Sequence, residues 1–110
     1  MSMYEKLKKV NDDRDAAAYL NLLGEGYVFV RHQSGTELSK AEWAPMITAM
    51  MSSSALEISD ERCIYENDEI VVMHQIMKFA DGSKESVMIV HSLKGGKIIR
   101  TETGATPIKH

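Results

Sequence analysis

The stretch that decides the fold runs from Leu56 to Thr103 and reads LEISDERCIYENDEIVVMHQIMKFADGSKESVMIVHSLKGGKIIRTET. Its apolar, β-branched runs are separated by three residue pairs that suit two-residue turns between antiparallel strands, because such turns need positive φ. These pairs are Asn67-Asp68, Asp81-Gly82 and Gly95-Gly96. The pattern predicts four antiparallel strands, Leu56–Tyr65, Ile70–Phe79, Lys84–Leu93 and Lys97–Thr103.

Two-residue turns would fix the register of these strands and therefore their two faces. The face with more large apolar groups and fewer charges is predicted to be the interior one. It holds Leu56, Ile58, Asp60, Arg62, Ile64, Val71, Met73, Gln75, Met77, Phe79, Ser86, Met88, Val90, Ser92, Ile99, Thr101 and Thr103. A slip of one residue would exchange the faces, so the predicted site depends on the turn lengths.

The chain before this meander is predicted to be mainly helical. Apolar residues recur at helical spacing over residues 3–10 and again over residues 16–23, as one helix or as two. Ser39 and Glu42 form a capping box that begins a further helix carrying Trp43. Helices on one face of a mostly antiparallel sheet make an α+β fold, and we expect one domain spanning residues 1–110.

Composition and charge argue against several kinds of partner. The net charge is -3 at pH 7 without a basic cluster, whereas nucleic-acid binding depends on neutralising phosphates. No apolar run approaches the ~18 residues of a transmembrane helix, and the N-terminus lacks the apolar core of a signal peptide. The lone Cys63 leaves no internal disulfide, which fits a reducing compartment. We expect a cytoplasmic protein without a nucleic-acid or membrane partner.

Three segments in order resemble the nuclear transport factor 2-like superfamily, in particular its SnoaL-like and ketosteroid-isomerase-like small proteins. They are YVFVRHQSG at residues 27–35, the helix that carries Trp43, and the end of the meander, GGKIIRT, at residues 95–101. The resemblance implies a cone-shaped, strongly curved, mostly antiparallel sheet wrapped around N-terminal helices. It implies no single reaction, since the superfamily includes isomerases, dehydratases, cyclases, hydrolases and transport adaptors.

The resemblance also suggests where a catalytic base would lie. Ketosteroid isomerases carry a proton-shuttling carboxylate just after the first strand, and His32 looks like the occupant of that place. Alternation over Tyr27–His32 is predicted to point Val28, Val30 and His32 inward, where an imidazole can take and return a proton near neutral pH. The alternative is a histidine hydrogen-bonded to backbone at a pocket rim. Met88 stands where the resemblance places the oxyanion-hole acid, so that mechanism does not transfer.

The interior face carries a polar island of Asp60, Arg62 and Gln75 among apolar groups. Buried polar groups need partners, so Asp60 and Arg62 either satisfy each other or orient a ligand, with Asp60 as a second candidate proton acceptor. The predicted ligand-binding residues are Trp43, Arg62, Met73, Gln75, Met88 and Thr101, although core packing is the other role open to the apolar ones.

The outer face of the predicted sheet is unusually apolar. It carries seven aliphatic residues, Ile70, Val72, Ile76, Val87, Ile89, Leu93 and Ile98, which predict a homodimer through this face. Relatives of the resembling superfamily commonly pair in this way. His74 and His91 also fall here, but their spacing matches no metal-ligand motif, so we expect no metal. We expect no cofactor either.

Three functional hypotheses remain open at this point. The first is a small isomerase or lyase that acts on a hydrophobic carbonyl compound with His32 as base. The second is a non-catalytic module that holds a small hydrophobic molecule in the same pocket. The third is a dimeric interaction domain whose cavity has no ligand. The sequence leaves open whether the protein is an enzyme.

Overall fold

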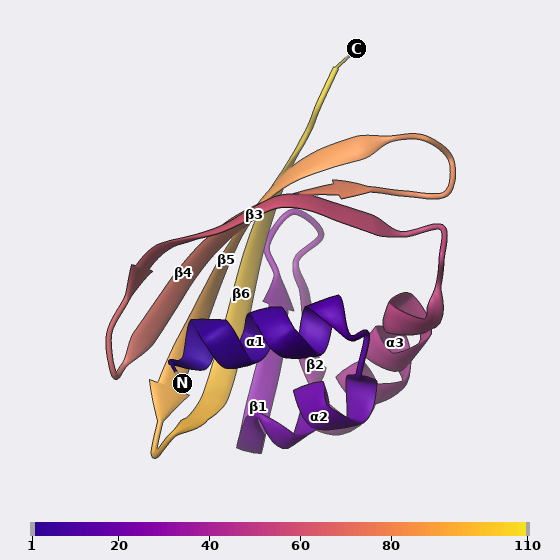
Figure 1. Ribbon diagram of the computed structural model, residues 1–110. Coiled ribbons are helices and arrows are strands. Elements are labelled where there is room, and N and C mark those ends of the chain that lie inside the picture. Colours follow the sequence, from indigo (N-terminus) through magenta and orange to yellow (C-terminus); the bar gives the residue numbers. More distant parts are fainter. Residues whose placement is uncertain (1, 110) are drawn as a thin grey trace.

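The computed structural model describes residues 2–109, which form three helices and one six-stranded sheet (Figure 1). In chain order the elements are α1 (Met3–Asp12), α2 (Ala16–Asn21), β1 (Leu23–Arg31), β2 (Thr36–Ser39), α3 (Lys40–Ser52), β3 (Glu57–Glu66), β4 (Ile70–Lys78), β5 (Lys84–Lys94) and β6 (Lys97–Pro107). The strand order is β2-β1-β6-β5-β4-β3, and β1 with β6 is its parallel pair. The predicted α+β fold is confirmed.

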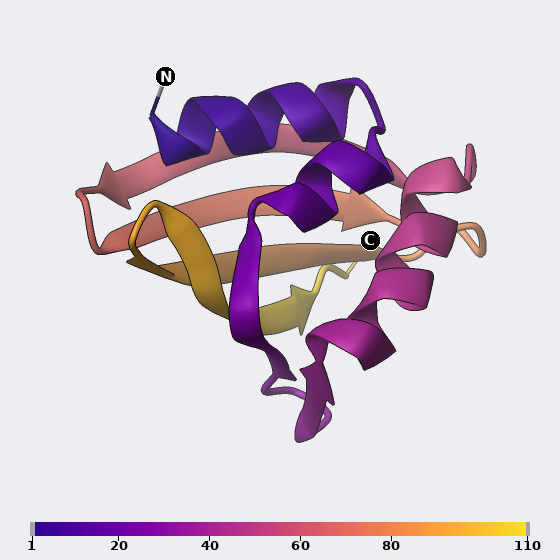
Figure 2. The same cartoon turned by 90° about the horizontal axis from the view of Figure 1, so that it is seen from below.

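The sheet is strongly curved and open, and its concave face holds the three helices (Figure 2). α1 lies along β3, and the Tyr4 backbone N–H donates to the Glu66 carboxylate at 3.0 Å. The core lies between the helices and the sheet and comprises Met3, Leu7, Val10, Tyr19, Leu23, Tyr27, Phe29, Trp43, Met51, Val71, Met73 and Ile98. Among residues 2–109, none of the helices is long and apolar enough to span a bilayer.

The N-terminal segment forms two helices because the chain breaks at Arg14. Arg14 has φ 51°, a left-handed conformation that ends α1, and the Asp15 side chain then caps α2. The Arg14 guanidinium donates to the backbone carbonyls of Ser53 and Leu56, the second at 2.9 Å. It therefore fixes the junction of α1 and α2 against the segment that leaves α3. The predicted capping box of Ser39 and Glu42 at the start of α3 is confirmed.

The turn between β4 and β5 is one residue longer than predicted, and this reverses the faces of β5. The Phe79 N–H donates to the Ser83 carbonyl at 2.9 Å, which leaves a three-residue loop closed by Gly82 at φ 86°. Lys78 consequently pairs with Lys84, and Met73 with Ile89. The residues of β5 that face the core are Val87, Ile89, His91 and Leu93, whereas Met88 is 42% exposed. The inward prediction for Met88 was wrong.

β-Bulges change the facing of β3 and β6 as well. The register of β3 shifts between Ser59 and Arg62, where Asp60 adopts φ 54°. This bulge turns Cys63 toward the core and Arg62 away from it, opposite to the prediction. A shift in β6 likewise buries Ile98 completely, although Thr101 still faces the interior as predicted.

The facing of β1 was also predicted one residue out of phase. Tyr27 and Phe29 enter the core cluster, because these large aromatic rings pack under the helices. Val28 and Val30 lie on the other face, although Val30 is also buried there. A register shift between Leu23 and Val28, with Gly26 at φ 75°, accompanies this arrangement. His32 therefore falls beyond the strand end on the outer side.

Candidate functional site

A cavity of about 550 Å³ lies between the concave face of the sheet and the helices. Its wall is mainly apolar and comes from every helix and from β1, β3, β4, β5 and β6; it includes Leu7, Tyr19, Phe29, Trp43, Ile47, Met50, Met51, Leu56, Ile58, Met73, Met77, Val87 and Ile89. The sheet contributes the polar residues Gln75, His91, Thr101 and Thr103, and the polar residues at the open end are Lys8, Asn11, Asp12, Arg14, Ser59, Asp60 and Glu61.

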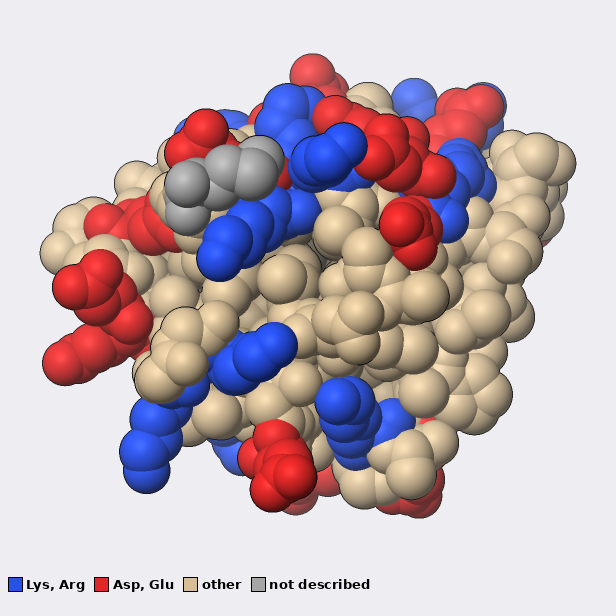
Figure 3. Space-filling model, turned by 60° about the horizontal axis from the view of Figure 1, so that its bottom comes forward, with Lys and Arg blue, Asp and Glu red and all other residues tan. Residues whose placement is uncertain are grey.

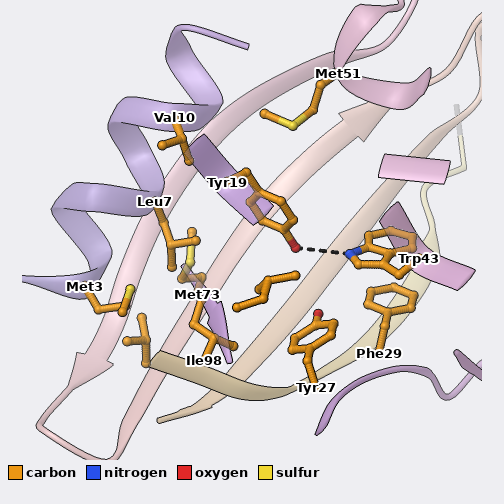
Figure 4. Close-up of a cluster of buried hydrophobic side chains, with 12 residues drawn as sticks. Met3, Leu7, Val10, Tyr19, Tyr27, Phe29, Trp43, Met51, Met73 and Ile98 are labelled. Carbon is orange, nitrogen blue, oxygen red and sulfur yellow. Dashed lines mark hydrogen bonds between the residues drawn. The ribbon is translucent and has the colours of Figure 1, made fainter. Parts of the chain in front are cut away.

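The deep end of the cavity is built from aromatic side chains (Figure 4). The Trp43 indole stacks on Phe29 with ring centroids 3.9 Å apart, and its Nε1–H donates to the Tyr19 hydroxyl at 3.2 Å. Because Tyr19 uses its oxygen as the acceptor here, its own O–H remains available as a donor. The buried Tyr27 hydroxyl points toward the Tyr19 and Thr101 hydroxyls, which affect its pKa, but it makes no hydrogen bond of normal geometry with a described residue. Burial raises the pKa of both tyrosines.

A hydrogen-bonded histidine and threonine, on β5 and β6, add polar groups to this end. His91 is 5% exposed, and its Nδ1 lies 2.8 Å from the Thr101 hydroxyl on the neighbouring strand. Burial lowers the pKa of His91 to about 4, so the imidazole is neutral at neutral pH. Within residues 2–109 no hydrogen bond reaches its Nε2. We call Tyr19, Tyr27, Trp43, His91 and Thr101 the deep polar cluster.

Gln75 is the second polar feature of the wall. It lies in the middle of β4 between Met73 and Met77, which also line the cavity, and it is 5% exposed. Its Oε1 is buried and has no hydrogen-bond partner among the described residues. Such a group costs roughly 1–3 kcal/mol when it stays unpaired, so a partner inside the cavity would be favourable.

The bulge of β3 places two carboxylates at the open end of the cavity. Asp60 is exposed, and the adjacent Glu61 is half-buried against α1 with Oε1 unpaired among the described residues. Burial raises the pKa of Glu61, while the positive charge of Lys8 on α1 opposes the shift. On the helical face shown in Figure 3, acidic and basic side chains are mixed, and broad uncharged areas lie between them.

The structure brings together Trp43, Met73, Gln75, Thr101 and, at the open end, Asp60, all of which line the cavity. It does not bring His32 to them. The His32 side chain is 59% exposed, and its Nε2 lies 3.0 Å from Glu102 on the outer side of β6. This contact, together with Arg100, lowers the pKa of Glu102. The inward position predicted for His32 was wrong. The prediction that His32 acts as a base inside the cavity is therefore wrong as well.

Two further predicted placements were wrong. Arg62 does not pair with Asp60; its Nε lies 3.5 Å from Nδ1 of His74 on the outer face. His74 also contacts Ser86 at 2.7 Å, whereas His91 faces the cavity, so the two histidines lie on opposite faces of the sheet. Neither Arg62 nor Met88 lines the cavity.

Several cavity residues were not singled out from the sequence, namely Tyr19, Glu61 and His91, and neither was the neighbouring Tyr27. Tyr19 carries a signal, since it falls on the apolar stripe of α2 and brings a hydroxyl to it. The sequence carries no such signal for His91, because the direction of its side chain depends on a single residue in the preceding turn.

A second cavity of about 320 Å³ lies next to the first, and six residues line both: Phe29, Trp43, Met50, Met77, Val87 and Thr103. Its wall is mostly apolar, and Arg31 and Glu85 are its charged members.

Comparison with solved structures defines the class of fold. The chain superposes on a nuclear transport factor 2-like protein of unknown function from Mesorhizobium loti with TM-score 0.81 at 16% identity, over 94% of this chain and 89% of the other. A similar protein from Burkholderia xenovorans gives TM-score 0.77 at 12% identity, over 97% and 84%. A steroid delta-isomerase from Pseudomonas aeruginosa gives TM-score 0.78 at 13% identity, over 96% and 77%.

The chain therefore has the nuclear transport factor 2-like fold, and the resemblance seen in the sequence is confirmed at the level of fold. No protein-family model matches the sequence, and no curated protein matches it.

Proposed function

We propose that this protein binds a small, largely apolar organic molecule in the cavity between sheet and helices. The observation that carries the proposal is Gln75, whose buried side-chain oxygen has no hydrogen-bond partner among the described residues and lies on a mainly apolar wall. Apolar lining with a few fixed polar groups is typical of small-molecule sites, and about 550 Å³ falls within their usual range. The similarity in fold to a steroid delta-isomerase is in keeping with this size and polarity of ligand.

The fluorescence of Trp43 allows this proposal to be tested, because Trp43 is the sole tryptophan and lines the cavity. The neutral apolar dye N-phenylnaphthylamine is titrated into the protein while energy transfer from Trp43 to the dye is recorded. We expect saturable transfer with one dye per chain. Dye emission that rises linearly without saturation, or that develops without transfer from Trp43, would show that the cavity does not bind it.

A second candidate function is proton transfer on a hydrophobic carbonyl compound, as in an isomerase or lyase. The observation that favours it is His91, a neutral imidazole on the cavity wall with its Nδ1 held by Thr101. If Nδ1–H donates to Thr101, Nε2 is a proton acceptor. It would take the proton from the carbon beside the carbonyl and return it to another carbon. Tyr19 would donate its O–H to the oxygen on which negative charge develops.

This second function can be tested without a known substrate by using nitrobenzisoxazole. A base removes the ring C–H proton of this compound, the electron pair forms a nitrile, and the N–O bond breaks to release a coloured phenolate. We expect His91→Gln to lower the rate by about 10²-fold or more while the dye still binds. An equal rate in the wild type and in His91→Gln would exclude His91 as the base.

A further inference from the structure

We infer that the ligand is an elongated, uncharged molecule with one hydrogen-bonding group at each end, one paired with Gln75 and the other with the deep polar cluster. This inference rests on the proposed binding function. The inference specifies a class of ligand, whereas the size of the cavity alone does not.

The spacing of the two polar ends follows from the strand register. Gln75 on β4 pairs with Val87 on β5, and His91 lies four residues further along β5 on the same face. At about 3.3 Å per residue, the two backbone positions are roughly 13 Å apart. The pair between them, Met73 with Ile89, is apolar and lines the cavity. A ligand that reaches both ends therefore needs an apolar middle.

Both ends call for neutral groups on the ligand. At the Gln75 end, the amide can accept or donate and carries no charge. At the deep end, the Tyr19 O–H can donate, and the neutral His91 ring leaves Nε2 without a partner among the described residues. A carboxylate or ammonium buried at either place would lack a counter-ion, and burying an unpaired charge is costly. Hydroxyl and carbonyl groups fit both ends.

The charged residues of the cavity lie elsewhere, which supports the same conclusion. Lys8, Asp12, Arg14 and Asp60 line its solvent-exposed end, and the half-buried Glu61 lies next to Asp60 at that end. A charged ligand group would be stabilised there and would leave Oε1 of Gln75 and Nε2 of His91 without a partner among the described residues. An ordered water bound to Gln75 is the competing explanation, and it predicts a ligand with one polar end.

A matched pair of rigid probes separates these possibilities. para-Phenylphenol and para,para'-biphenol differ by a single hydroxyl at the far end of the same apolar body. Binding is measured by displacement of N-phenylnaphthylamine and by calorimetry. We expect the wild type to bind biphenol about tenfold more tightly than phenylphenol, as one additional buried hydrogen bond would give. The shorter pair phenol and hydroquinone cannot span the two ends and should show no such preference.

Variants at each end complete the test. Gln75→Leu should bind phenylphenol at least as well as the wild type, which shows that it folds, and should lose the preference for biphenol. Thr101→Val, which releases His91, should reduce the same preference from the deep end. Equal binding of the two probes by the wild type, or a preference that survives Gln75→Leu, would overturn the two-ended ligand. If the dye binds and neither phenol does, this inference fails and the proposed function stands. If the dye also fails to bind, both fail.

Discussion

The placement of His91 differs most in its consequences from the prediction, because it moves a histidine from the outer face of the sheet to the cavity wall. A histidine on a strand of alternating residues can face water or the core, and here it is buried next to a hydroxyl with its ring neutral. Burial lowers its pKa, and no charged side chain among residues 2–109 contributes to the shift. Its protonation is therefore linked to unfolding.

This linkage predicts a loss of stability in mild acid. The pKa of His91 is about 4 in the folded chain, against about 6.5 unfolded, so between these values the unfolded state binds the additional proton. Stability is unaffected by His91 above pH 6.5 and falls as the pH drops toward 4. We expect a loss of about 2 kcal/mol from this residue between pH 7 and pH 5.

Urea unfolding of the wild type and of His91→Gln at the two pH values measures this effect, because the difference between the two proteins isolates His91. The same pH dependence in both proteins would contradict the burial of a neutral His91.

Residues whose direction does not depend on a turn could be predicted from the sequence. Trp43 lies on an apolar stripe of a capped helix, and Met73 and Gln75 lie on the face of β4 that was predicted to be interior. The directions of His32, Arg62 and Met88 could not be predicted. Each residue follows a bulge, a strand end or a loop, which determines the face of the sheet on which its side chain lies. One residue of register decides whether such a side chain faces the ligand or the solvent.

At the scale of elements, the β4–β5 loop and the β3 bulge decide the composition of the cavity. The sequence Ala80-Asp81-Gly82 is compatible with either a two- or a three-residue loop, since Gly82 supplies the positive φ in both cases. Local sequence therefore predicts that a hairpin forms there but not which face of β5 is buried. Packing of Ile89 against Met73 settles the choice.

The β3 bulge predicts an unusual response to substitution at Asp60. A β-branched residue is strained at φ 54°, so Asp60→Val should lower the free energy of unfolding by about 1–2 kcal/mol, and Asp60→Gly should be neutral or stabilising. Urea unfolding measures both. Ser59→Val, one residue earlier on the same exposed segment, is the control and should cost less. Equal effects of the two valine substitutions would mean that the bulge is not fixed at Asp60.

At the scale of the whole molecule, the convex face of the sheet is a candidate contact surface. Of the seven aliphatic residues predicted there, Ile70, Val72 and Ile76 have the expected facing, whereas Val87, Ile89, Leu93 and Ile98 face the interior. Met88 and Val90 take their place on the convex face, next to His74 and Val72. The convex face therefore keeps an apolar centre.

We expect a homodimer through this convex face, as proposed from the sequence. Met88→Lys should place a charge at its centre and shift the protein to monomer, which light scattering at micromolar concentration detects. Ser54→Lys, in the exposed loop after α3, adds the same charge elsewhere and should leave the dimer intact. A wild type that is monomeric under these conditions would exclude the dimer.

Adjacent residues of β5 allow the most direct test of ligand binding in the cavity. Ile89 lines the cavity and Met88 lies on the convex face, so Ile89→Phe fills the cavity while Met88→Phe adds a similar ring outside it. The measurement is the dissociation constant of N-phenylnaphthylamine, read by energy transfer from Trp43, in both variants and the wild type. We predict that Ile89→Phe weakens binding at least tenfold and that Met88→Phe leaves it unchanged. Equal binding by Ile89→Phe and the wild type, or loss of binding in Met88→Phe alone, would contradict a ligand site between the sheet and the helices.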